Sequence, residues 1–180
     1  MSDVWLDITD IPAQGREFSF SDPSLWADPI KRFGMPVTLS ETAPFEAAFT
    51  VIPEGRGALI KGWFKGEATT PCSRCAEDAL IRLDETFELF EELPLEGEES
   101  LEEGLVRQRG KILELNVSGM LWEEFMLAMP VKPVCDENCP GLCPGCGRKL
   151  DKGECSCQKD AGDPRFAALR KMKIAPKDDQ

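Results

Sequence analysis

The sequence of 180 residues contains no histidine and no tyrosine. Histidine is the usual general base that activates a serine or cysteine nucleophile, and it is the nitrogen ligand of most catalytic zinc sites. The sequence also lacks a glycine-rich phosphate-binding motif. We therefore expect a protein that is not an enzyme. Any metal site must be built from sulfur, with at most a carboxylate among its ligands.

Long apolar runs are also missing. No segment reaches the eighteen apolar residues that a membrane helix needs. The first twelve residues carry three aspartates and neither a basic stretch nor an apolar run, which argues against a signal peptide. We expect a cytoplasmic protein without membrane contact. In that compartment, closely spaced cysteines are metal ligands more often than disulfides.

Eight cysteines are present, and they fall into four close pairs. The last two pairs are Cys143 with Cys146 and Cys155 with Cys157. A two-residue gap lets one turn present both sulfurs to a single ion, and zinc readily takes four thiolates. Glycines flank Cys146, and we expect that a β-carbon would crowd a backbone folded tightly around metal. The pattern predicts a structural zinc site made of Cys143, Cys146, Cys155 and Cys157.

The remaining cysteines are Cys72, Cys75, Cys135 and Cys139, and they predict a second zinc site if the fold brings the two pairs together. The cofactor is then one or two zinc ions. Two alternatives stay open. Cys72 and Cys75 also have the spacing of a redox pair, in which Arg74 would lower a thiolate pKa. Cys135 and Cys139 could instead complete a site with Cys143 and Cys146.

Charge is unevenly distributed along the chain. The formal net charge is −12, which disfavours general binding to nucleic acid. Residues 84–103 contain ten acids and no base, whereas residues 148–177 contain nine bases and four acids. The basic residues Arg165, Arg170, Lys171 and Lys173 are candidates for partner binding, together with Arg74. Alternatively, this basic segment is the end of a helix that keeps the protein in solution and binds no partner.

The central part of the chain predicts antiparallel strands. Residues 45–52 and 58–64 flank a turn with two glycines and form a hairpin. Residues 79–90 alternate apolar and polar side chains, interrupted only at Glu85, so the first cysteine pair lies at a tip between two strands. A short strand is expected at 111–115. A helix over 117–129, capped by Asn116 or Ser118 and stopped by Pro130, supplies an apolar face.

We therefore predict an α+β fold: an antiparallel β-sheet domain with one covering helix, and a zinc-ordered C-terminal extension that ends in a short helix. Residues 1–36 are an N-terminal arm with at most one short strand at 16–20. The β domain spans 37–130 and includes an acidic loop at 91–104. The cysteine-rich segment 131–160 has too few apolar side chains for a core, so a metal must order it. Residues 161–180 form the short helix and basic tail.

The order of these motifs resembles the bacterial YceD family, also known as domain of unknown function 177. The resemblance rests on Cys72-Ser73-Arg74-Cys75 after a strand, on Glu114-Leu115 leading into the stretch from Glu123 to Pro130, and on the cysteine pattern that ends at Asp163-Pro164-Arg165-Phe166. It covers roughly residues 37–174.

The resemblance implies a role in large-subunit ribosome biogenesis, with a ribosomal protein or a precursor of large-subunit rRNA as partner. Family members support accumulation of the 23S rRNA, and their genes commonly lie beside that of a small ribosomal protein. Some members lack the C-terminal cysteine cluster, which suggests that zinc there stabilises the protein. The alternative hypothesis is a thiol-redox or metal-responsive regulator that uses Cys72 and Cys75.

Overall fold

In a computed structural model of the chain, the described residues are 4–93, 104–150 and 155–157. The chain divides into two compact units, Met1–Cys139 and Pro140–Gln180. The predicted acidic loop lies largely outside the described residues, and so do the predicted C-terminal helix and basic tail with Arg165, Arg170, Lys171 and Lys173.

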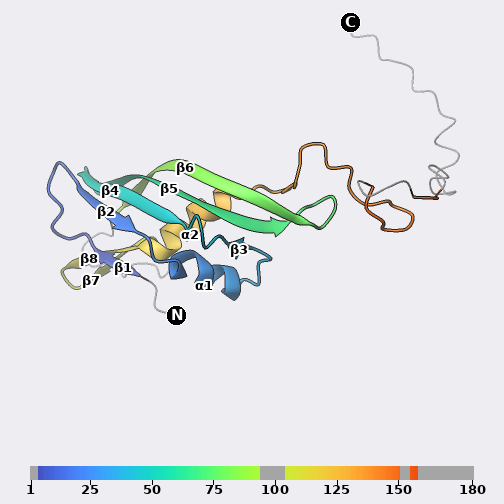
Figure 1. Cartoon of the computed structure of the whole chain (residues 1–180). Coiled ribbons are helices and arrows are strands. Elements are labelled where there is room, and N and C mark those ends of the chain that lie inside the picture. The colour runs from blue at the N-terminus through green and yellow to red at the C-terminus, as the bar shows by residue number, and fades with distance from the viewer. Residues whose placement is uncertain (1–3, 94–103, 151–154, 158–180) are drawn as a thin grey trace, which may run out of the picture. The chain divides into compact units, whose positions relative to one another are not determined.

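The first unit contains two antiparallel sheets (Figure 1). The larger sheet has the order β2-β4-β5-β6, and the short β3 pairs with the distal part of β5. Its strands are β2 (Arg16–Phe20), β3 (Thr38–Leu39), β4 (Glu46–Glu54), β5 (Gly57–Pro71) and β6 (Asp78–Glu92). The smaller sheet has the order β1-β8-β7 and consists of β1 (Trp5–Asp7), β7 (Val106–Arg109) and β8 (Ile112–Asn116).

The predicted hairpins are present. β4 and β5 pair from Glu46↔Lys65 to Glu54↔Gly57 around the glycine-bearing turn. β5 and β6 then pair without a break from Gly57↔Glu92 to Pro71↔Asp78, which leaves Cys72 and Cys75 at the tip. Glu85 does not interrupt β6, because it pairs with Phe64 in the regular register.

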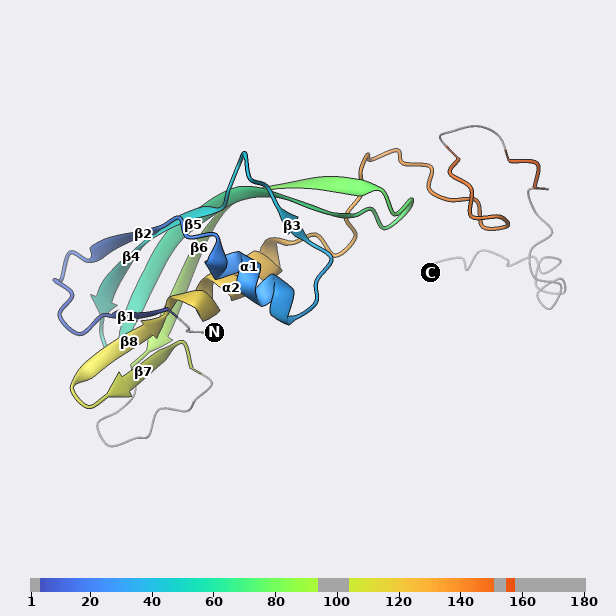
Figure 2. The same cartoon turned by 60° about the horizontal axis from the view of Figure 1, so that its bottom comes forward.

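Two helices, not one, lie on the same face of the larger sheet (Figure 2). The predicted helix is α2 (Val117–Ala128), and the Asn116 side chain caps it by accepting a hydrogen bond from the Gly119 N–H at 2.9 Å. The additional helix is α1 (Ser24–Arg32). The prediction of one covering helix and a nearly irregular N-terminal arm is therefore wrong. Residues 1–36 supply β1, β2 and α1.

The core lies between this sheet face and the helices. Trp26 of α1 is fully buried, and its ring centroid lies 5.5 Å from that of Phe45. Phe45 in turn meets Phe125 of α2 edge to face at 5.5 Å. A β-carbon on Gly66 of β5 would lie 2.6 Å from the Phe45 ring, so this glycine makes room for the aromatic cluster. Phe125 is thus a core residue, as its place on the apolar face of the predicted helix indicates.

Candidate metal centres

The first cysteine pair occupies a tight turn at the tip of β5 and β6. The Cys72 N–H donates a hydrogen bond to the Glu77 carbonyl at 2.7 Å, and the Ala76 N–H donates to the Cys72 carbonyl at 2.9 Å. Ala76 has a φ of 59°, in the left-handed region that non-glycine residues rarely adopt. The turn places both thiols on one side of the tip.

The segment after α2 brings the second cysteine pair to this turn. The Ser73 N–H donates to the Pro133 carbonyl at 2.8 Å. The four Sγ atoms of Cys72, Cys75, Cys135 and Cys139 all lie within 4.8 Å of one another. The Cys72–Cys139 and Cys75–Cys135 sulfur separations are 3.9 and 3.6 Å.

These distances suit a shared ion. Sulfurs about 2.3 Å from a tetrahedral centre lie about 3.8 Å from one another. All four cysteines are free thiols. Three of them are buried and pack with Ala79 and Val134, whereas Cys135 is exposed. The first unit therefore extends beyond the predicted boundary at residue 130, because the cysteines at 135 and 139 belong to it.

Arg74 acts on the cluster differently from the prediction. Its guanidinium Nη1 donates to the carbonyls of Glu137 and Cys139 at 2.9 and 3.0 Å, which ties the turn to the second pair. The Arg74 backbone N–H, not its side chain, is the group that faces the Cys72 sulfur, at 3.4 Å. The side chain thus fixes the geometry of the cluster, and the main chain stabilises the thiolate.

The thiols of this cluster differ in acidity. Burial raises the pKa of Cys72, but the N–H groups of Arg74, Cys135 and Cys75 lower it more, so the pKa is about 6. Hydrogen bonds with the Cys75 and Cys139 side chains raise the pKa of Cys135 to about 12. Without a metal, the cluster thus combines an acidic thiol with one that keeps its proton at neutral pH.

The second unit contains another turn of the same kind. The Cys143 N–H donates to the Arg148 carbonyl at 2.8 Å, and the Gly147 N–H donates to the Cys143 carbonyl at 2.8 Å. An isolated bridge between Leu142 and Lys149 closes the turn into a short hairpin. The sequence therefore encodes two copies of one local structure, which the spacing of two residues between cysteines indicates.

Gly147 suits this turn because of the backbone dihedral angle that the turn requires, and not because a side chain would be crowded. Gly147 has a φ of 70°, and a β-carbon there would meet nothing within 4 Å. A β-carbon on Gly145 would lie 3.4 Å from the Cys157 sulfur, an ordinary contact. The expectation that a β-carbon would crowd this backbone is wrong, and the left-handed conformation is what favours glycine.

The predicted ligands of the second unit are brought together. The sulfurs of Cys143, Cys146, Cys155 and Cys157 lie within 4.8 Å of one another, with Cys143 and Cys155 at 3.3 Å. Backbone N–H groups of Cys146 and Gly145 and the Cys155 thiol lower the pKa of Cys143 to about 6. Hydrogen bonds with Cys146 and Cys143 raise that of Cys157 to about 12.

The structure decides between the arrangements that the sequence leaves open. Cys135 and Cys139 lie with Cys72 and Cys75, and Cys143 and Cys146 lie with Cys155 and Cys157. Each cluster can hold one metal ion. No helix among the described residues has the length and the apolar content to cross a membrane.

The fold and the clusters define a small α+β protein with two four-thiol centres of the type that holds structural metal ions. The family model described as large ribosomal RNA subunit accumulation protein YceD matches residues 60–173, so the chain belongs to the YceD family. The match includes all eight cysteines.

Several curated proteins are similar to the chain. Uncharacterized proteins of Mycobacterium tuberculosis and Mycobacterium bovis are 27% identical over 146 residues, which cover 79% of this chain and 68% of each relative. A chloroplastic protein of Arabidopsis thaliana, named large ribosomal RNA subunit accumulation protein YCED homolog 1, is 20% identical over 156 residues. That match covers 72% of this chain and 49% of the plant protein. No solved structure matches the chain.

Proposed function

We propose that this protein is a non-enzymatic, cytoplasmic factor in large ribosomal subunit biogenesis. It supports accumulation of 23S rRNA by binding a ribosomal protein or precursor rRNA. The observation that carries this proposal is the family match over residues 60–173, because the family is named for accumulation of the large ribosomal RNA. The similarity to the plant protein of the same name adds support.

In this proposal each cysteine cluster holds one zinc ion with a structural role. The absence of histidine leaves all-sulfur ligand sets, and four thiolates leave no position open for a substrate. Elemental analysis of the purified protein should give two zinc ions per chain. Iron in a four-sulfur site is the other common outcome, and finding it would exclude the zinc assignment.

Charge suggests how the protein contacts the assembling subunit. The acidic residues of the 84–103 run suit a basic ribosomal protein, and the basic tail with Arg165, Arg170, Lys171 and Lys173 suits rRNA phosphates. Arg74 is exposed and can add to the contact with phosphates.

The experiment is to delete the gene, measure 23S rRNA relative to 16S rRNA, and purify the tagged protein from growing cells with and without ribonuclease. A fall in 23S rRNA that the wild-type gene restores supports the proposal. Unchanged 23S rRNA overturns it. Recovery of large-subunit precursors that ribonuclease abolishes points to rRNA as the direct partner, and resistant recovery of a ribosomal protein points to that protein.

The alternative is a thiol-redox or metal-responsive regulator that uses Cys72 and Cys75. The observation that favours it is the pKa of Cys72 near 6, because thiolates are the reactive form. This function predicts reversible oxidation of the pair with release of zinc at cellular redox potentials. Alkylation of Cys72 that a chelator does not accelerate would count against a metal at this pair.

A further inference from the structure

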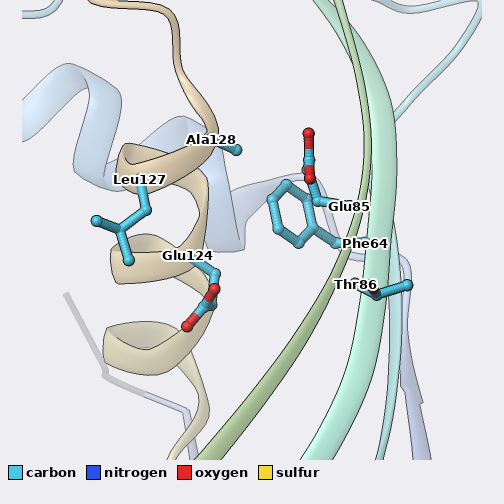
Figure 3. Close-up of a pocket in the computed structure, with 6 residues that line it drawn as sticks. All are labelled: Phe64, Glu85, Thr86, Glu124, Leu127 and Ala128. Atoms are coloured by element: carbon cyan, nitrogen blue, oxygen red, sulfur yellow. The ribbon is translucent and has the colours of Figure 1, made fainter.

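A groove lies between the C-terminal part of α2 and strands β5 and β6 (Figure 3). It has a volume of about 270 Å³ and is lined by Phe64, Glu85, Thr86, Glu124, Leu127 and Ala128. The Phe64 ring forms an apolar wall, and carboxylates come from both the strand and the helix. All six residues belong to the first unit.

Glu85 is the unusual residue of this groove. Side chains alternate along β6, and its neighbours on the same face, Leu83 and Phe87, are buried in the core. Glu85 thus places a carboxylate on the inward face of the sheet, opposite Phe64 in the register. This is the position at which the apolar alternation of the sequence breaks. A core-facing carboxylate is costly unless it stays accessible or finds a partner, and here it is accessible beside the end of α2.

The helix side of the groove is apolar at its rim. Leu127 is 80% exposed although it lies on the last turn of α2, and Met126 and Val131 are exposed beside it in sequence. Exposed Leu127 thus offers apolar surface at the rim that a ligand can bury. The groove therefore combines an apolar wall and rim with carboxylates.

Negative charge in this region is not balanced by a base in the described part of the chain. Among the described residues, Glu85, Glu91, Glu123 and Glu124 form no ion pair with a lysine or arginine. Burial and the charge of Glu123 raise the pKa values of both Glu91 and Glu124, so Glu123 repels each of these two carboxylates. A cationic ligand would relieve this repulsion.

We propose that this groove docks a basic segment of a partner protein, with a lysine or arginine placed between Glu85 and Glu124. The aliphatic stem of that residue would pack on Phe64, and an apolar neighbour would cover Leu127. The inference rests on the proposed function in that the partner is then a basic protein of the assembling subunit. The two carboxylates and the chain's net charge of −12 make a nucleic acid the wrong ligand for this groove.

The test measures binding of a labelled twelve-residue peptide of alternating arginine and leucine to the full chain by fluorescence anisotropy. The double variant Glu85→Gln, Glu124→Gln should weaken binding about tenfold, because two charge contacts are lost. The matched control is Asp84→Asn, Glu92→Gln, which removes the same charge from the opposite face of β6. It should change the affinity less than about twofold. Equal weakening by both variants would mean general attraction and would overturn the proposal.

Leu127→Ser supplies a second variant that should fold normally, since its side chain is mostly exposed. It should weaken peptide binding about threefold, and no change would contradict an apolar contact at the rim. A further variant tests whether the basic tail of the chain itself occupies the groove. In this full-length variant Arg165, Arg170, Lys171 and Lys173 are all changed to glutamine. Much tighter peptide binding by this variant would show that it does, and would overturn docking of a partner.

Complementation separates this inference from the proposed function. If wild type restores 23S rRNA in the deletion strain and Glu85→Gln, Glu124→Gln does not, while the control variant does, both are supported. If all three restore it equally, the groove inference fails and the proposed function stands. If deletion leaves 23S rRNA unchanged, the proposed function fails, and the peptide measurements alone decide the groove.

Discussion

The turn at Cys72–Cys75 and the turn at Cys143–Cys146 share one pattern of backbone hydrogen bonds but differ in their surroundings. The first lies at the tip of two long paired strands, and its partner cysteines follow about sixty residues later. The second lies in a short hairpin, and its partner cysteines follow within fourteen residues. The same turn can therefore close a long loop onto a formed sheet or order a short segment by itself.

This difference assigns different physical roles to the two ions. The first unit has a hydrophobic core that does not depend on metal, so an ion there adds stability to a structure that already exists. The described residues of the second unit contribute only Cys143 to the buried apolar set, so an ion there must supply most of the folding energy.

The largest effect is expected when metal is removed from the second unit. Cys143→Ser should lose one equivalent of zinc, and the segment around it should become fully accessible to protease. The free energy at stake is the whole binding energy, about 10 kcal/mol or more for structural zinc. Limited proteolysis with mass spectrometry measures the outcome. Unfolding of the β unit should not change, and a shift of its midpoint would contradict the contrast.

Cys72→Ser should also lose one equivalent of zinc, but it should leave the β unit folded. Its free energy of unfolding should fall by about 3–4 kcal/mol, the stabilisation that free zinc provides at a few hundred to a thousand times its dissociation constant. Denaturant unfolding followed by tryptophan fluorescence reports this, because Trp26 is in the core. A dependence of the loss on reductant instead of on zinc would favour the redox alternative.

Acidification should release zinc from both clusters. Thiols bind zinc as thiolates, so Cys135 and Cys157, whose pKa values are near 12 without metal, must lose their protons on binding. Protons then compete with zinc, and the affinity falls as the pH is lowered. The fall should steepen below about pH 6, where Cys72 and Cys143 also take up protons. Chelator competition between pH 5 and 8 measures this, and an affinity independent of pH would exclude thiolate ligation.

The smallest effect is expected at the residue that directly follows each turn pair, Cys72–Cys75 and Cys143–Cys146. Ala76 and Gly147 occupy the same position of the turn, and both have positive φ values. Gly147→Ala should destabilise zinc binding in the second unit by about 1 kcal/mol, because alanine resists this conformation. Ala76→Gly should relieve that strain and be neutral or stabilising by up to about 1 kcal/mol. Zinc affinity and unfolding midpoints report both, and effects of equal sign would show that the turns are not equivalent.

The elements predicted correctly from the sequence are those with local signals. The β4–β5 hairpin follows from alternation and a glycine turn, and α2 follows from its Asn116 cap and Pro130. The sequence does not predict α1, because Pro29 lies inside it and breaks the usual helical pattern, although Leu25, Trp26 and Ile30 form an apolar face. Its stability comes from burial of Trp26, which local propensity does not report.

The candidate sites, too, could be predicted where their signals are local and could not where they depend on the folded chain. Pairing of Cys143 and Cys146 with Cys155 and Cys157 is local and could be predicted. Pairing of Cys72 with Cys139 depends on where the chain returns after α2, so the sequence left alternatives. The break in alternation at Glu85 was visible, but the groove was not, because α2 comes to lie beside it only in the folded chain. Ala76 follows Cys75 directly, as Gly147 follows Cys146. The glycine at the matching position is therefore a sequence signal for the left-handed conformation of Ala76.

The position of β6 at the edge of the sheet affects the tendency of this protein to aggregate. β6 is fifteen residues long and pairs only with β5 among the described strands, so one edge of about 50 Å presents unpaired main-chain groups. Such an edge invites other chains to add to it and start fibrils. Asp78, Asp84, Glu88 and Glu92 are all exposed along it, and their mutual repulsion between copies opposes that growth. Part of the acidity of this sequence therefore protects the protein against aggregation, independently of any partner.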